Sequence, residues 1–261
     1  MADDVVLVEV SDRVATMTLN RPGARNALNR ELRRAIPDAL RQLEDDDGVD
    51  VLILTGADPA FCAGLDLKEL GSGEHDLARS IGDERTRQGP LPQHTKPVIG
   101  AINGVAVTGG FELALACDLL VASERARFAD THARVGVQPG WGLTVLLPQA
   151  IGLRRAREMS ATGNFLDAPT ALAWGLVNHV VAHDELLAFC RSLAADIVSN
   201  DQPGVRRVLQ TYAEGSEVSA GEAWGVEARA ASDWLRHGGG RPEEVERRRQ
   251  AIVDRGRTQT S

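Results

Sequence analysis

Residues 51–55 (VLILT) form a short, unbroken apolar run, and this feature most restricts the possible folds of the chain. A strand that is apolar at every position must be covered on both faces of its sheet. Before it, apolar residues recur from Leu28 to Leu43 at the spacing of a single helical stripe. Doubly covered strands that alternate with amphipathic helices predict an α/β fold.

The same order recurs along the first half of the chain. Residues 5–20 predict a β-hairpin, and Pro37 should kink the helix that follows or cost it one backbone hydrogen bond. Residues 97–107 predict two strands joined by a turn, Gly109 and Gly110 open a helix, and residues 118–122 form the next strand. Two passes of strand, turn, strand and helix indicate a structural repeat.

The rest of the chain has a different pattern. Residues 69–96 are rich in glycine, proline and charged side chains, which is typical of a mobile or weakly helical flap. From about residue 140 the pattern is mainly helical, and Asp184 is the expected N-cap of one helix. We therefore expect a core over residues 1–200 and an all-helical region over 201–261, whose apolar side chains need a partner surface.

Composition and motifs disfavour several classes of function. The 261 residues include 29 Lys and Arg against 37 Asp and Glu, and the net charge of −8 argues against nucleic acid or an anionic membrane as the main partner. The sequence lacks P-loop, serine-hydrolase and zinc-protease motifs, so we expect no metal site. Three widely spaced cysteines and the lack of a signal peptide or apolar span predict a cytoplasmic protein.

Two segments combine small residues with one functional side chain. They are Phe61–Lys68 (FCAGLDLK) and Asn103–Glu112 (NGVAVTGGFE). Each leads from a strand toward a helix start, where backbone N–H groups lack partners and glycine allows a ligand to approach. Facing each other, the two segments could present two N–H groups to one oxyanion, although Gly-Gly before a helix is more often a plain turn.

The chain resembles the crotonase (enoyl-CoA hydratase/isomerase) superfamily in four motifs that keep the family's order and spacing. These motifs are NRP and NAL within residues 20–28, FCAGLDLKEL at 61–70, KPVIGAINGVAVTGGFELALACDLLVAS at 96–123 and FADTHARVGVQPGWG at 128–142. The resemblance implies an α/β spiral of ββα repeats and a C-terminal helical region that assembles trimers, or hexamers made of two trimers. It also implies a core that binds an acyl-CoA thioester in fatty-acid metabolism and stabilises its enolate without a separate cofactor.

The resemblance assigns the oxyanion hole to the backbone N–H groups of Leu65 and Gly109. The positions that it assigns to substrate and CoA binding are Arg25, Ala63, Leu65, Asp66, Leu67, Lys68 and Gly109. Lys68 could meet a CoA phosphate and Arg25 the nucleotide end. The alternative for both is an ordinary surface cation.

Glu112 lies where hydratases of this family keep the first of two catalytic glutamates. An acid at a helix start also stabilises the helix, which is the alternative role. The surrounding helix is otherwise apolar, and a carboxylate in such surroundings is costly unless it has a use. We therefore expect Glu112 to be the main acid/base.

His132 occupies the position of the second hydratase glutamate. An imidazole, with an ordinary pKa of about 6.5, can serve as a general acid or base near neutrality, or it can merely line the pocket wall. Asp130 should point to the opposite face if a strand continues to residue 132. Trp141 is expected to be a core or interface aromatic.

Three functions remain open at this point. The preferred one is a hydratase-like lyase that adds water to an enoyl-CoA or eliminates it, with Glu112 and His132 as catalytic residues. The second is an acyl-CoA-binding protein of weak activity, because the second glutamate is missing. The third is a double-bond isomerase, which the replacement of that glutamate also disfavours.

Overall fold

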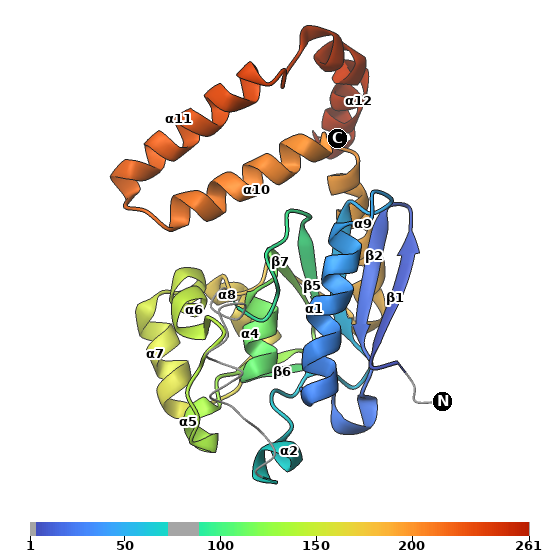
Figure 1. The fold of residues 1–261 in the computed structure, drawn as a ribbon. Helices are drawn as coiled ribbons and strands as arrows, with labels where there is room; N and C mark the ends of the chain where they lie inside the picture. Colours follow the sequence, from blue (N-terminus) through green and yellow to red (C-terminus); the bar gives the residue numbers. More distant parts are fainter. Residues whose placement is uncertain (1–3, 73–88, 261) are drawn as a thin grey trace. The chain divides into compact units, whose positions relative to one another are not determined.

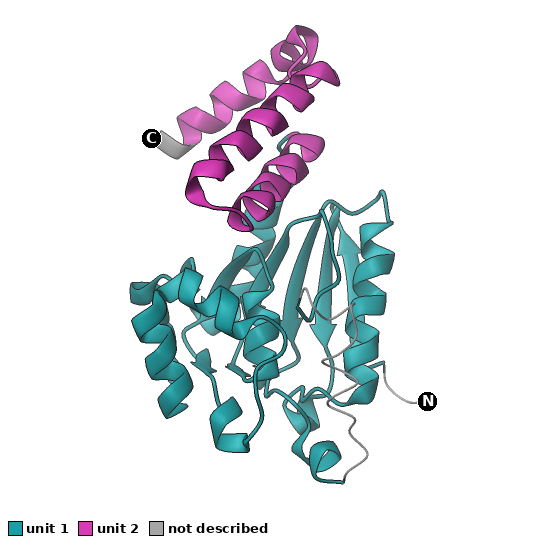
Figure 2. Ribbon diagram, turned by 60° about the vertical axis from the view of Figure 1, so that its left-hand side comes forward, with its two compact units in different colours: residues 1–200 teal, residues 201–261 magenta. Residues whose placement is uncertain are grey.

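A computed structural model describes residues 4–72 and 89–260 of the chain. The chain divides into two units, Met1–Asn200 and Asp201–Ser261, which Figure 2 colours separately. Most of the expected flap, residues 73–88, lies outside the described residues, and the part before it forms the short helix α2 (Leu67–Gly71).

The first unit is built on a six-stranded sheet with the order β1-β2-β3-β5-β7-β10 (Figure 1). Its strands are β1 (Val6–Ser11), β2 (Val14–Leu19), β3 (Val51–Gly56), β5 (Val98–Ile102), β7 (Leu119–Ser123) and β10 (His179–Val181). β1 and β2 form the predicted antiparallel hairpin, and the remaining neighbours are parallel.

β3 shows why its sequence is apolar throughout. Leu52 and Leu54 belong to the main core, together with side chains of the amphipathic helix α1 (Arg30–Glu44). Val51 and Ile53 point to the other face, where they pack in a second cluster with α9 (Leu186–Val198). Both faces of the strand are therefore covered, as predicted.

α1 begins at its N-cap Asn29, whose side chain accepts a hydrogen bond from Leu32 N. Its buried residues are Leu32, Ile36, Leu40 and Leu43, which are the stripe seen in the sequence. The helix continues through Pro37, so the proline costs an N–H donor without ending the helix.

A second, four-stranded sheet has the order β4-β6-β8-β9. Its strands are β4 (Ala60–Cys62), β6 (Val105–Val107), β8 (Arg127–Ala129) and β9 (Leu166–Asp167). The two strands predicted within residues 97–107 are present, but they belong to different sheets, since β5 pairs with β3 and β7 whereas β6 pairs with β4 and β8.

The order of elements confirms the ββα repeat. β1, β2 and α1 are followed by β3, β4 and α2, then by β5, β6 and α4 (Gly109–Leu115), and then by β7, β8 and α5 (His132–Val135). From the second repeat onward, the first strand of each repeat joins the six-stranded sheet and the second strand joins the four-stranded sheet. The helix of each repeat begins after that second strand. This arrangement brings the ends of β4, β6 and β8 to one place.

Helices complete the first unit: α6 (Leu143–Ile151), α7 (Leu153–Thr162), α8 (Ala168–Trp174) and α9. The expectation for Asp184 is wrong, because this residue lies inside a short 3-10 helix, His183–Glu185, and Glu185 precedes α9. Asp184 is therefore part of the 3-10 helix, and Glu185 stands at the N-cap position of α9.

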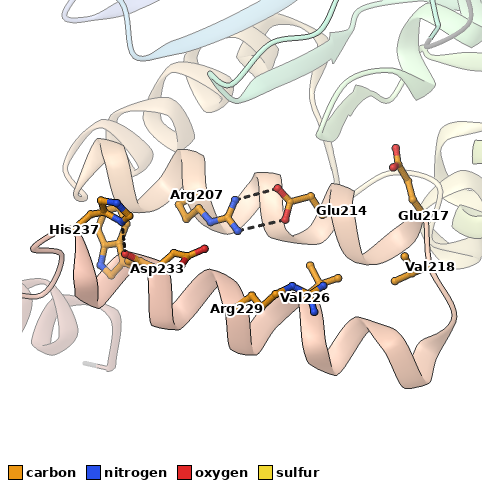
Figure 3. A pocket seen from close by; sticks show the side chains of 9 residues that line it. Arg207, Glu214, Glu217, Val218, Val226, Arg229, Asp233 and His237 are labelled. Carbon is orange, nitrogen blue, oxygen red and sulfur yellow. Dashed lines mark hydrogen bonds and ion pairs between the residues drawn. The ribbon is translucent and has the colours of Figure 1, made fainter.

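The second unit consists of α10 (Gln202–Ser216), α11 (Ala220–Arg236) and α12 (Pro242–Thr260). Ser219 and Glu222 form a capping box at the start of α11. Between α10 and α11 lies a groove of about 650 Å³ that contains the Arg207–Glu214 ion pair (Figure 3). No helix in the described part of the chain is both long and apolar enough to cross a bilayer.

Candidate active site

The two glycine-containing segments lie side by side at the end of the second sheet. β4 and β6 are parallel neighbours, with Cys62 opposite Ala106. Gly64 has a φ of +84°, and a Cβ there would lie 2.6 Å from the carbonyl oxygen of Val107. A Cβ on Gly110 would collide with the carbonyl group of Cys62. The two segments therefore approach as closely as only glycine allows.

Leu65 and Gly109, the predicted oxyanion donors, follow these two strands. Leu28 N donates to Gly64 O over 2.7 Å and Asp66 N donates to Leu28 O over 3.3 Å, so the N–H of Leu65 between them points away from Leu28. Gly109 is the first residue of α4, where an N–H has no partner within the helix. Within residues 4–72 and 89–260, neither N–H donates a backbone hydrogen bond.

Glu112 lies in the first turn of α4 and is only 3% exposed. Its Oε1 accepts hydrogen bonds from the backbone N–H groups of Trp141, over 2.8 Å, and of Leu143, over 3.4 Å. Two backbone donors satisfy this buried carboxylate on one side and fix its orientation. The other oxygen, Oε2, is left to face a different neighbour.

That neighbour is His132, the first residue of α5, which is 4% exposed. Its Nε2 lies 3.4 Å from Glu112 Oε2. The structure therefore brings together the two residues that the sequence nominated as the catalytic pair. At 3.4 Å the contact is longer than a strong N–H···O bond, so Oε2 and Nε2 are both able to bond to a shared ligand.

The sequence analysis placed Asp130 on the opposite face on the condition that a strand reached residue 132, and that condition is not met. β8 ends at Ala129, so the alternation of strand faces does not extend to residue 132, and Asp130 turns toward His132. Its Oδ1 lies 2.6 Å from His132 Nδ1 and also accepts from the backbone N–H of His132. The spacing Asp-x-His was the available signal, because a side chain two residues before a helix start reaches the first N–H.

Glu112 and Asp130 stabilise the charged form of His132, and His132 stabilises the charged form of Asp130. Burial by itself would lower the pKa of His132, but the hydrogen bonds to Asp130 and Glu112 outweigh burial and raise the pKa to about 9. Burial would raise the pKa of Asp130, but hydrogen bonds from His132 and Ser160 outweigh it and lower that pKa. These contacts favour the protonated form of His132 and move its pKa above the ordinary value.

Trp141 packs against the main core, as expected, and it also lies at this site. A Cβ on Gly109 would sit 3.3 Å from a ring carbon of Trp141. Its backbone N–H is the donor to Glu112. The indole Nε1 is buried and has no hydrogen-bond partner among the described residues. Gly109, which has no side chain, allows this close approach.

Among the residues assigned to CoA binding, some side chains are exposed and one has a structural role. Arg25, Leu67 and Lys68 are exposed, and the backbone of Arg25 is joined to Ala63 by the bond from Ala63 N to Arg25 O. Asp66 has a structural role: its carboxylate is 3.1 Å from the guanidinium of Arg21, and it caps α2 through Lys68 N.

Nothing in the described part of the chain forms a three-residue cluster of His, Cys, Asp and Glu suited to a metal ion. Cys62 borders the Gly64 segment, but burial raises the pKa of its thiol to about 12, so it is not an activated nucleophile. The chemistry available here is proton transfer between Glu112 and His132 beside two backbone N–H donors.

Comparison with known proteins agrees with this geometry. Residues 9–238 match the family model described as "Enoyl-CoA hydratase/isomerase". A probable peroxisomal enoyl-CoA hydratase 1 of Arabidopsis thaliana is 39% identical over 249 residues, which cover 94% of this chain and 91% of that protein. A crotonyl-CoA hydratase of Syntrophomonas wolfei is 35% identical, covering 88% of this chain and 89% of that protein.

Two solved structures show the same fold. An enoyl-CoA hydratase from Mycobacterium tuberculosis is 53% identical, with a TM-score of 0.74 and coverage of 88% of this chain and 96% of that one. An enoyl-CoA hydratase from Bacillus anthracis is 33% identical, with a TM-score of 0.87 and coverage of 95% and 96%.

Proposed function

This chain belongs to the enoyl-CoA hydratase/isomerase family, and we propose that its Glu112–His132 pair adds water across the double bond of an enoyl-CoA thioester. The relatives identify the chain as an enoyl-CoA hydratase-like enzyme, a lyase of acyl-CoA metabolism. The observation that carries the assignment to this pair is the distance of 3.4 Å between Glu112 Oε2 and His132 Nε2, at the ends of the two glycine-containing segments.

The thioester oxygen is held by the backbone N–H groups of Leu65 and Gly109. Charge develops on this oxygen when water attacks the β-carbon, and fixed N–H donors stabilise it more in the transition state than in the substrate. Among the described residues, neither N–H group donates a backbone hydrogen bond, so both remain available to a substrate oxygen, which supports this role. Arg25 and Lys68, both exposed, are available to the CoA phosphates.

After one turnover, Glu112 and His132 are both back in their starting protonation states. Glu112 accepts a proton from water while the water oxygen bonds to the β-carbon and electrons move to the thioester oxygen as an enolate. His132 then gives its Nε2 proton to the α-carbon as the enolate collapses. Finally Glu112 returns its proton to His132, which the 3.4 Å contact permits. The net reaction consumes one water and needs no cofactor.

Glu112→Gln tests this assignment on the full chain. The amide keeps an oxygen for Trp141 N but removes the base, so we expect turnover of crotonyl-CoA to fall by at least about 10²-fold with product affinity nearly unchanged. Loss of the conjugated-thioester absorbance measures turnover, and calorimetry measures affinity. Unchanged turnover would contradict the role of Glu112, and tight binding without turnover in the wild type would favour an acyl-CoA-binding protein.

We also propose that the second unit assembles the protein into trimers or hexamers. One side of the α10–α11 pair is a largely apolar groove whose residues include Val208, Tyr212, Ala231 and Trp234. Tyr212 and Trp224 are each 75% exposed, which is costly in water without a partner. Sedimentation at micromolar concentration should give at least three copies, and a single 28.0 kDa species would refute the proposal.

A cytoplasmic location is proposed as well. Its support is that all three cysteines are buried free thiols, as suits a reducing compartment. Fractionation of the source cells, with antibodies against this chain, tests the location.

A further inference from the structure

Asp130 makes a two-point contact with His132. One oxygen, Oδ1, accepts from the backbone N–H over 3.1 Å and lies 2.6 Å from Nδ1 of the ring. Asp130 and His132 are 2% and 4% exposed, so water does not compete for these bonds. The contact fixes both the backbone and the ring plane of His132.

The surrounding elements hold Asp130 in turn. The side chain of Ser160, on α7, hydrogen-bonds to its carboxylate. The next residue, Thr131, is tied to the end of β6, since its Oγ1 lies 2.6 Å from Thr108 Oγ1. Asp130 is therefore held by polar contacts on its own carboxylate and on the next residue, as a group that orients another residue must be.

A carboxylate at Nδ1 decides which ring nitrogen exchanges a proton. Because ionised Asp130 only accepts hydrogen bonds, Nδ1 must keep its hydrogen. The exchangeable proton is then on Nε2, the nitrogen that lies 3.4 Å from Glu112 Oε2. If the hydrogen were lost from Nδ1 instead, Nε2 would stay protonated and could not accept the proton that Glu112 returns.

We propose that Asp130 is a positioning residue for catalysis: its carboxylate keeps the hydrogen of His132 on Nδ1, so that Nε2 is the atom that gives and receives the proton. This inference rests on the proposed function of the Glu112–His132 pair. It assigns to Asp130 no contact with substrate.

The other groups around His132 are consistent with this role. Among the described residues, the charges that act on its ring are Glu112 of α4 and Asp130 itself. The hydroxyl of Ser160 acts on Asp130, and the guanidinium of Arg134 on α5 bonds to the carbonyl group at the end of α7. Removing the charge of Asp130 should therefore lower the titration midpoint of the ring.

The first test is nuclear magnetic resonance of full-length protein labelled with ¹⁵N-histidine. The chain has six histidines, and His132→Gln identifies the signals of His132. In the wild type we expect Nδ1 to stay protonated while Nε2 titrates. If the neutral ring of the wild type carries its hydrogen on Nε2, the proposal is wrong, and this result needs no variant that must fold.

Asp130→Asn keeps the shape and the acceptor oxygen but removes the charge. We expect the midpoint of His132 to fall by at least about one pH unit, or the hydrogen to move to Nε2. Asp167→Asn is the matched control, because Asp167 also accepts a backbone N–H at a helix start, from Thr170, but contacts no histidine. An unchanged midpoint and an unchanged tautomer in Asp130→Asn would overturn the proposal.

Kinetics separate positioning from a purely structural role. Asp130→Asn should lower kcat by about 10²-fold with little change in KM, and it should have almost no further effect in a His132→Gln background. An equal loss in both backgrounds would show that Asp130 does not act through His132. If the wild type fails to hydrate enoyl-CoA, the proposed function falls, while the resonance measurements still decide the role of Asp130.

Discussion

The carboxylate of Glu112 accepts a hydrogen bond from the backbone N–H of Trp141, with 2.8 Å between Oε1 and N. This bond joins the start of α4 to the loop before α6 and commits one carboxylate oxygen to the backbone. The second oxygen is thereby directed to His132. A residue at position 141 thus orients the base through its main chain.

The first prediction concerns the pH dependence of hydration. His132 must carry a proton to protonate the α-carbon, so kcat/KM should fall as the pH rises through about 9. His132→Gln should remove this alkaline limb and most of the turnover. The measurement is a pH–rate profile, with His179→Gln, an exposed histidine on β10, as the control. A limb near pH 6.5 instead would show that the two carboxylates do not act on the ring.

The second prediction concerns His132→Glu. The family pattern alone suggests that this change restores the usual pair, but the structure places Asp130 and Glu112 on either side of the ring. A third carboxylate between them would be repelled by both. We expect His132→Glu alone to lie at least about tenfold below the wild type in kcat, and the addition of Asp130→Asn to recover part of the loss.

Crotonyl-CoA turnover of wild type, both single variants and the double variant measures this effect. Chemical denaturation of the same four proteins reports the repulsion directly, because His132→Glu should be the least stable of them. Activity of His132→Glu at or above the wild-type level would contradict the charge argument.

The third prediction concerns the close approach of the two glycine-containing segments. Gly110→Ala should destabilise the protein by about 2–3 kcal/mol, because the new methyl group meets the carbonyl of Cys62 and the backbone must move. Gly221→Ala, in α11, has open space and should be neutral or slightly stabilising. Urea unfolding compares the two. Equal stabilities would mean that the segments are not held in contact.

The fourth prediction concerns Lys96, which is 1% exposed. Its ammonium group donates to the carbonyl oxygens of Leu43 and Asp46, each over 2.6 Å, at the C-terminal end of α1. Lys96→Met should cost about 1–3 kcal/mol, because the buried carbonyl of Leu43 loses its donor. The matched control is Lys68→Met, an exposed lysine whose loss should leave the unfolding free energy unchanged. A melting temperature as high as that of the wild type would contradict the capping role.

Much of the local structure could be predicted from the spacing of apolar residues. The hairpin, α1, β3 and the helix opened by Gly109 all lie where the pattern placed them. Patterns report which face of an element is buried, but they do not report which strands become neighbours. The separation of β5 and β6 into different sheets was therefore not predictable.

Asp130 shows the same limit at the site. β6 ends at Val107, because Thr108 turns into α4, so the ladder that holds β8 stops at Ala129. Asp130 is then free of the strand geometry and turns to His132. The end of a strand depends on its partner, which lies elsewhere in the sequence.

The amino-acid sequence is enough to identify the residue types: two glycine-containing turns, one glutamate in an apolar helix start and a histidine at the expected position of its partner. The orientation of these side chains, and the charges that act on each, depend on how the chain packs. Electrostatic interactions depend on distance through space. Glu112 meets His132 only after their two segments have packed, whereas Asp130 reaches His132 locally once β8 ends at Ala129. The contacts in the folded chain therefore raise the pKa of His132 above the value near neutrality that the sequence alone suggested.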